Sequence, residues 1–238
     1  MKNLFLFIAA AAISFAGSAQ SDIAISSAAG SGGSGFALNK EAIISEMNDG
    51  TFDGSAYLYD DWIKGIVIMP DGVGAEYYMK YNVLEDRIEF SETADGKGIR
   101  AIPNNPNYVI QLGKERFQYL NFADVSNDLD GIFKIIKPFD EETILVRRYQ
   151  RSIQDMSEAQ KSSYSSQSRP RVLETDDFYF IEKGMIKEIK NHKKRSLKSL
   201  NEKNEKQLKA FIKDRDIDFD DEGKGLAEVI AYYLSLQK

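Results

Sequence analysis

The sequence contains no cysteine and a single histidine, and these two shortages exclude several kinds of site. Without cysteine the chain can form no disulfide, cannot carry the lipid of a bacterial lipoprotein, and cannot build a zinc site from Cys and His ligands. A Ser/His/Asp or Cys/His catalytic site would have to use His192, which is followed by Lys193-Lys194-Arg195 and has no carboxylate beside it in the sequence. We therefore expect a solvated histidine, and we assign no catalytic, cofactor-binding or metal-binding residue and no cofactor.

Long apolar runs are also scarce, and the one that is present lies at the N-terminus. Lys2 precedes an uncharged stretch from Leu4 to Phe15, and small residues follow up to Ala19. This order is that of a signal peptide, and the stretch is shorter than the roughly 20 apolar residues of a membrane-spanning helix. We expect residues 1–19 to be a signal peptide cleaved after Ala19, a periplasmic or secreted protein, and no transmembrane segment in the mature chain.

Composition divides the rest of the chain into four parts. Residues 20–50 include a run of Ser, Ala and Gly that predicts a flexible leader. Residues 51–151 alternate β-branched and aromatic runs with turn residues, which predicts an antiparallel β-rich domain. Residues 152–173 predict a mobile Ser-rich loop, and residues 174–238 predict a β-hairpin followed by helices with apolar residues at i, i+3 and i+4.

The connections between the expected strands are too short for helical crossovers, so neighbouring strands should pair antiparallel as a meander. Because an open sheet leaves its edges exposed, we expect the body to curl into a barrel-like or sandwiched form. The predicted fold class is α+β: an antiparallel meander or barrel-like body, then a β-hairpin and a C-terminal helical unit. The expected strands are Ser55–Tyr59, Trp62–Met69, Ala75–Asn82, Asp86–Ser91, Ile99–Ile102, Tyr108–Leu112, Arg116–Phe122, Ile132–Lys137, Thr143–Arg151, Asp177–Glu182 and Met185–Lys190.

Several short segments carry a family resemblance. They are Gly54-Ser55-Ala56-Tyr57-Leu58, Trp62-Ile63-Lys64-Gly65-Ile66-Val67, Lys80-Tyr81-Asn82-Val83, Asp86-Arg87-Ile88-Glu89-Phe90, Leu208-Lys209-Ala210-Phe211-Ile212-Lys213 and Tyr232-Tyr233. Together they resemble a group of uncharacterised secreted proteins common in Bacteroidota, over residues 50–150 and 175–238. The resemblance implies a pattern of strands, turns and helices but no activity, so no functional residue is carried over from it.

The formal net charge of −6 hides a strong asymmetry. Between Lys183 and Lys213, eleven Lys or Arg side chains stand against three Glu, a net of +8, which leaves −14 for the rest of the chain. Such a basic arm could bind nucleic acid, anionic lipid or acidic glycans. It could equally be a solvated helix face whose lysine stems cover apolar surface, the interpretation we favour. An exported protein is not expected to have a nucleic-acid partner.

Acidic residues gather at three places in the sequence. Ser126–Gly131 resembles a calcium loop, but it begins with Ser126 and has Lys137 where a bidentate Glu is required. Asp214–Glu222 lacks the glycine of such a loop, so neither segment predicts a calcium site. Asp60-Asp61 beside Trp62 could serve glycoside hydrolysis, although a polar turn before a strand is the simpler interpretation.

These observations favour a non-catalytic exported module of the cell envelope that binds a protein, glycan or lipid. The alternative is a carboxylate-based hydrolase of envelope or extracellular polysaccharide, which requires Asp60 or Asp61 to line a cleft facing a second acid. A third hypothesis is an accessory of an envelope assembly, which requires an exposed apolar stripe at Leu226, Ile230 and Tyr233. The sequence leaves the ligand and the oligomeric state open.

Overall fold

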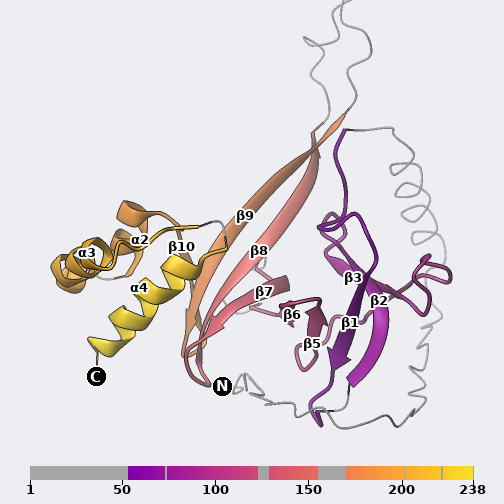
Figure 1. The fold of residues 1–238 in the computed structure, drawn as a ribbon, viewed down its shortest axis with the longest axis horizontal. Coiled ribbons are helices and arrows are strands. Elements are labelled where there is room, and N and C mark those ends of the chain that lie inside the picture. The colour runs from indigo at the N-terminus through magenta and orange to yellow at the C-terminus, as the bar shows by residue number, and fades with distance from the viewer. Residues whose placement is uncertain are drawn as a thin grey trace, which may run out of the picture.

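The computed structural model describes residues 53–72, 74–122, 129–154, 170–200, 202–220 and 222–237 (Figure 1). The expected signal peptide and leader, and residues 155–169 of the expected Ser-rich loop, lie outside these ranges. The elements are β1 (Ile63–Ile68), β2 (Gly74–Asn82), β3 (Arg87–Ser91), β4 (Arg100–Ala101), β5 (Val109–Leu112), β6 (Glu115–Leu120), β7 (Gly131–Pro138), β8 (Thr143–Gln154), β9 (Arg171–Glu182), β10 (Met185–Ile189), α2 (Lys193–Leu200), the 3-10 helix η3 (Glu202–Asn204), α3 (Glu205–Asp214) and α4 (Lys224–Ser235).

All ten strands belong to one antiparallel sheet with the order β10-β9-β8-β7-β6-β5-β1-β2-β3-β4. Strands β5 to β10 form the expected meander, whereas β5 returns to lie beside β1, which gives β1, β2, β3 and β5 a Greek-key order. The sheet is open, with β4 and β10 at its two edges, so the barrel-like closure is not confirmed. On the β10 side of the sheet, α2 contacts β10 and α4 contacts β7.

The open sheet still coils strongly on itself. Four strand spacings separate β2 from β7, about 19 Å in a flat sheet, yet the Tyr81 hydroxyl donates to the Ile132 carbonyl oxygen at 3.3 Å. The Asp86 carboxylate in the β2–β3 turn accepts from the same hydroxyl at 2.7 Å and from the Ile132 N–H at 3.2 Å. Gly131 makes room for this contact, since a Cβ there would collide with the Asp86 carboxylate. Burial raises the pKa of Asp86, against the opposing effect of these two hydrogen bonds.

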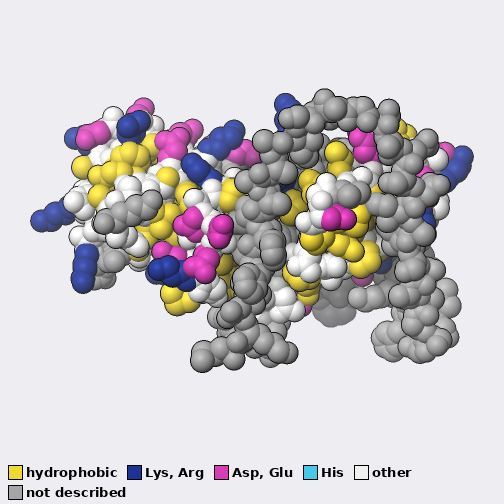
Figure 2. Space-filling model, turned by 90° about the horizontal axis from the view of Figure 1, so that it is seen from below, with side chains coloured by type: hydrophobic (Ala, Val, Ile, Leu, Met, Phe, Trp, Pro, Cys, Tyr) yellow, Lys and Arg dark blue, Asp and Glu magenta, His cyan; other side chains and the backbone are white. Residues whose placement is uncertain are grey.

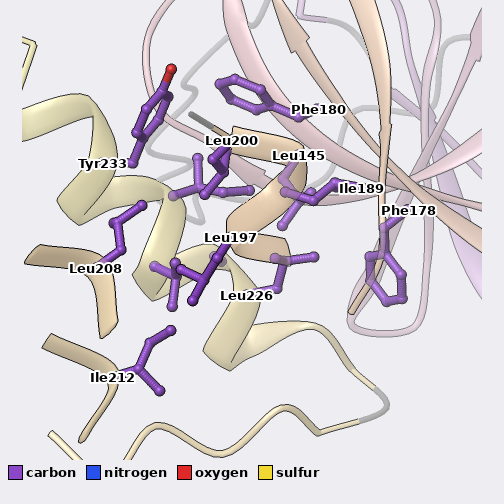
Figure 3. Close-up of a cluster of buried hydrophobic side chains, with 13 residues drawn as sticks. Leu145, Phe178, Phe180, Ile189, Leu197, Leu200, Leu208, Ile212, Leu226 and Tyr233 are labelled. Carbon is purple, nitrogen blue, oxygen red and sulfur yellow. The ribbon is translucent and has the colours of Figure 1, made fainter. Parts of the chain in front are cut away.

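Three clusters of buried side chains fill the interior. The first lies on the inner face of the coiled sheet and consists of Val67, Met79, Tyr81, Val83, Ile88, Phe90, Ile102, Ile110, Leu112, Phe117 and Ile132. The second lies on the opposite face of β7–β9 and consists of Leu120, Phe122, Phe133, Ile144, Val146, Tyr179 and Ile181. The third, here called the helix-side cluster, joins Leu145, Phe178, Phe180 and Ile189 of the sheet to Leu197, Leu200, Leu208, Ile212, Leu226, Ala227, Val229, Ile230 and Tyr233 of the helices (Figure 3).

Two expectations about the elements need correction. The expected strand Ser55–Tyr59 is reduced to one bridge, Tyr57 to Asn82, in line with the start of β1. The long strands β8 and β9 extend into the segment expected to be a loop, with Gln154 paired to Arg171. The β-hairpin is therefore part of the same sheet as the β-rich body.

Candidate functional site

Helices α2 and α3 carry the basic arm to one end of the molecule, opposite β1–β4 (Figure 1). The inner face of helix α2 is anchored to the rest of the molecule, because Leu197 and Leu200 are buried in the helix-side cluster. Its exposed residues include four cations, Lys193, Lys194, Arg195 and Lys198. Seen from below, Lys and Arg side chains project from this helical end of the molecule, with Asp and Glu side chains among them (Figure 2).

Of the four cations of α2, only Lys198 has an acidic group near it within the part of the chain that the structure describes: Glu205, whose pKa its charge helps to lower. None of them forms an ion pair there, and the helix has no acidic residue in its first turn. The N-terminus of a helix carries partial positive charge, so a cation in the first turn costs about 0.3–1 kcal/mol. Folding alone gives no reason for this placement.

The neighbouring elements show the compensation that α2 lacks. Lys190, just before α2, binds Asp177 and Glu188, and these hydrogen bonds raise the pKa of Lys190 above its ordinary value. Helix α3 has Glu205 in its first turn. At the start of α4, the Asp220 carboxylate accepts a hydrogen bond from the Lys224 N–H at 2.9 Å.

Helix α3 extends the charge of α2. Lys206, Lys209 and Lys213 recur at i, i+3 and i+7 and are exposed, while Leu208 and Ile212 are buried. Lys209 pairs with Glu205, and its hydrogen bond lowers the pKa of that carboxyl. We define the basic surface as the six exposed cations of α2 and α3 that form no ion pair with a described residue: Lys193, Lys194, Arg195, Lys198, Lys206 and Lys213.

His192 lies at the start of α2 and is exposed, as the sequence predicts. Its Nδ1 accepts a hydrogen bond from the Lys194 N–H at 3.2 Å, and its carbonyl oxygen accepts from the Ser196 N–H at 2.9 Å. The imidazole therefore shapes the first turn of the helix. No carboxylate of the described residues is hydrogen-bonded to it.

A charged seam joins the sheet to the helical unit, and sequence reasoning missed it. The Lys134 side chain of β7 is only 7% exposed, and its Nζ donates to Glu115 of β6 and, at 2.8 Å, to Glu222 just before α4. Burial alone would lower the pKa of Lys134, but the two carboxylates outweigh burial and raise it. The same contact lowers the pKa of Glu222.

Arg147, whose side chain is 13% exposed, is a second largely shielded cation of this region. Its guanidinium lies 4.7 Å from the ring centroid of Tyr149 and 5.3 Å from that of Phe178, and its Nε donates to Asp176 at 2.7 Å. Stacking and pairing hold the guanidinium between sheet side chains. We interpret Lys134 and Arg147 as structural groups that fix the helical unit, and with it the basic surface, on the sheet.

The acidic pair considered for glycoside hydrolysis lies on the surface. Asp60 and Asp61 are both exposed, and neither carboxylate forms a hydrogen bond or ion pair within the described ranges. The half-buried indole of Trp62 has Lys80 Nζ 5.6 Å from its ring centroid, and a Cβ at Gly96 would collide with the indole. Because Lys80 and Gly96 already lie against the Trp62 indole, little of the ring surface is free to stack on a sugar.

The segments considered for calcium are also used otherwise where they are described. Residues 123–128 lie outside the described ranges, and Asp130 accepts a hydrogen bond from the Tyr119 hydroxyl at 3.3 Å. In the second segment, Asp220 binds the start of α4 and Glu222 binds Lys134. Among the described residues no group of three or more His, Cys, Asp or Glu could hold a metal ion.

A depression on the outer face of β1, β2 and β5 has a volume of about 120 Å³ and is lined by Lys64, Gly65, Ile66, Glu76, Gln111 and Gly113. It is small beside ligand pockets of roughly 300–1,000 Å³. Lys64 and Glu76 pair across it at 2.9 Å. The inner face of the sheet, by contrast, is packed with large side chains such as Tyr81, Phe90 and Phe117, each at most 2% exposed.

Comparisons with protein-family models, curated proteins and solved structures found no match for this chain. In the residues that the structure describes, no helix has the length and apolar character to cross a membrane. The basic surface is the feature of the described residues that packing of the core does not explain.

Proposed function

We propose that this protein is an exported, non-catalytic binding module of the cell envelope, and that its basic surface binds an anionic envelope component. The observation that carries the proposal is the group of cations in the first turn of α2, Lys193, Lys194 and Arg195, which form no ion pair among the described residues and lie where the helix dipole disfavours them. Positions that break a local rule without a structural gain are expected at functional sites.

The simpler interpretation, a lysine face that only keeps the helix hydrated, explains less. Lysine stems covering apolar surface would account for exposed cations, but Leu197 and Leu200 are already buried beneath α2 by the helix-side cluster. Acidic and basic side chains together would hydrate a helix face just as well, as on α3, where Glu205 pairs with Lys209. The purely basic composition of α2 favours an anionic partner.

The two other hypotheses gain no support from the described residues. The carboxylate hydrolase requires a cleft at Asp60 or Asp61, and both side chains are exposed without a facing acid among their contacts. Docking through the last helix requires an exposed apolar stripe, whereas Leu226 and Ile230 are 0% exposed and Tyr233 is 7% exposed.

Salt elution from immobilised heparin, used as a generic polyanion, tests the proposal. The chain is expressed from Met1 and recovered from the exported fraction, where its first residue should be Gln20. The variant K194Q/R195Q/K198Q is compared with the control K114Q/R116Q/K137Q. The control also replaces two lysines and one arginine, but at exposed positions of the sheet and its turns. Glutamine is a good helix former, so α2 should persist.

The wild type and the control should elute at a similar salt concentration, and the α2 variant at a clearly lower one. Equal shifts for the two variants would mean that only net charge matters, which would refute a localised surface. Failure of the wild type to bind would refute the proposal as a whole, and an uncleaved or unexported chain would refute its envelope location.

A further inference from the structure

We infer that the partner of the basic surface is a bilayer surface rich in anionic lipid headgroups, an inference that rests on the proposed function. The choice is among the anionic components that an envelope protein can meet, chiefly anionic lipid and acidic glycan. Three features of the surface favour the lipid: the chemistry of its side chains, the lack of a groove at α2, and the charge distribution of the chain.

The side chains of the surface are suited to a diffuse anion. Five of its six cations are lysines, whose ammonium groups are flexible point charges, and the single guanidinium belongs to Arg195. Recognition of a defined carboxylate or phosphate typically uses the bidentate geometry of arginine. An array of lysines instead matches phosphates that can rearrange within the plane of a bilayer.

Helix α2, which carries four of the six cations, also lacks the side chains that glycan binding would use. The sequence of α2, KKRSLKSL, has no aromatic side chain for sugar stacking and no Asn, Gln, Asp or Glu to bind hydroxyl groups. Its apolar residues face inward, and the depression near Lys64 lies on the sheet, away from the helices. Contact through α2 must therefore be electrostatic and superficial, without insertion of apolar side chains.

The charge asymmetry of the chain gives this contact a direction. The basic arm carries a net +8, whereas residues 53–101, which include β1–β4, have ten Asp or Glu against five Lys or Arg, a net of −5. Near a negatively charged bilayer the helical end is attracted and the acidic sheet is repelled, so the β1–β4 end should point away from the membrane (Figure 1). Trp62, the only tryptophan, precedes β1 at that distant end and serves as a reporter.

Cosedimentation with lipid vesicles tests the inference, using the exported protein and the two triple variants described above. One vesicle set contains equal parts phosphatidylglycerol and phosphatidylcholine, and the other contains phosphatidylcholine alone. Soluble polygalacturonate represents an acidic glycan. Each basic residue near an anionic membrane contributes about 1 kcal/mol, so three substitutions in α2 should weaken binding on the order of 100-fold.

We expect binding to the phosphatidylglycerol vesicles alone, loss in the α2 variant, a much smaller effect in the control, and no shift of Trp62 fluorescence. Raising the salt from 0.1 M to 1 M shortens the screening length from ~10 Å to ~3 Å and should abolish binding. Equal binding to both vesicle types, or a blue shift of Trp62 emission, would overturn the inference.

The two proposals fail in distinguishable ways. If polygalacturonate binds through α2 and the vesicles do not, the lipid inference is wrong and the binding module stands with an acidic glycan as its partner. If neither binds and heparin retention is also absent, both proposals are wrong.

Discussion

Replacing Lys134 with methionine tests whether the charged seam holds the helical unit on the sheet. Methionine keeps the unbranched shape but removes the cation that Glu115 and Glu222 share. The Oε2 atom of Glu115 is already buried without a hydrogen-bond partner, so K134M leaves that carboxylate largely unpaired. Removing one partner of a fully buried pair costs about 3–5 kcal/mol.

The expected loss is smaller here because both glutamate side chains are partly exposed. The side chains of Glu115 and Glu222 are 27% and 53% exposed, so we expect a decrease of about 2–3 kcal/mol in the free energy of unfolding. With an m-value of about 2 kcal/mol/M, the urea midpoint should fall by about 1–1.5 M. Unfolding followed by circular dichroism measures this shift.

A matched control separates burial from simple loss of charge. Lys64 pairs with Glu76 across strands β1 and β2, but both side chains are more than half exposed. K64M should therefore destabilise the fold much less than K134M. The double variant K134M/E115L, which also removes the orphaned carboxylate, should recover much of the loss. If K134M unfolds at the same urea concentration as K64M, the seam does not stabilise the fold as argued.

Three further predictions concern the pH dependence of stability, the backbone conformation at Gly223 and the packing of Phe133. Lys134 holds the pKa of Glu222 below its ordinary value of 4.5. The ionised Glu222 therefore contributes fully to stability above pH 4.5, and this contribution is lost as the pH falls through the lower pKa of the folded state. The decrease in the free energy of unfolding from pH 5 to pH 2 should be shallower in E222Q than in the wild type, and an unchanged slope would contradict the pairing. G223A should lower the free energy of unfolding by about 2 kcal/mol, because Gly223 has a φ of 76° and a Cβ there would overlap the Phe178 ring. A melting temperature equal to that of the wild type would show that Gly223 does not pack against Phe178 as described. F133A should cost about 3–5 kcal/mol in urea unfolding, since Phe133 is 0% exposed between Phe122 and Tyr179; a loss under 1 kcal/mol would contradict that packing.

Most of the strands could be predicted because local chemistry marks them. The turn Pro70-Asp71-Gly72 separates two runs that become β1 and β2, and the ends of these strands fall within a residue or so of expectation. Strand order could not be predicted in the same way. The return of β5 to β1 depends on burial of Leu112 and Phe117 with Met79, and nothing in the alternation of one strand names its neighbour.

The site was predictable to the extent that it follows from sequence charge. A basic arm between Lys183 and Lys213 was evident, as was the exposed position of His192, but the sequence could not show which cations lack a partner. The sequence does not distinguish Lys190 from Lys193, yet of the two only Lys190 forms ion pairs with described residues, Asp177 of β9 and Glu188 of β10. The Lys134–Glu222 pair joins residues 88 positions apart. Its one local signal is a lysine inside the apolar run Ile132–Ile136.

Backbone hydrogen exchange in the presence of a soluble polyanion shows directly where the anion binds. We predict slower exchange in α2 and α3 on adding heparin, no change in β1–β6, and no protection in K194Q/R195Q/K198Q. Protection confined to the sheet, or none in the helices at saturating heparin, would contradict the claim that these cations form the binding surface.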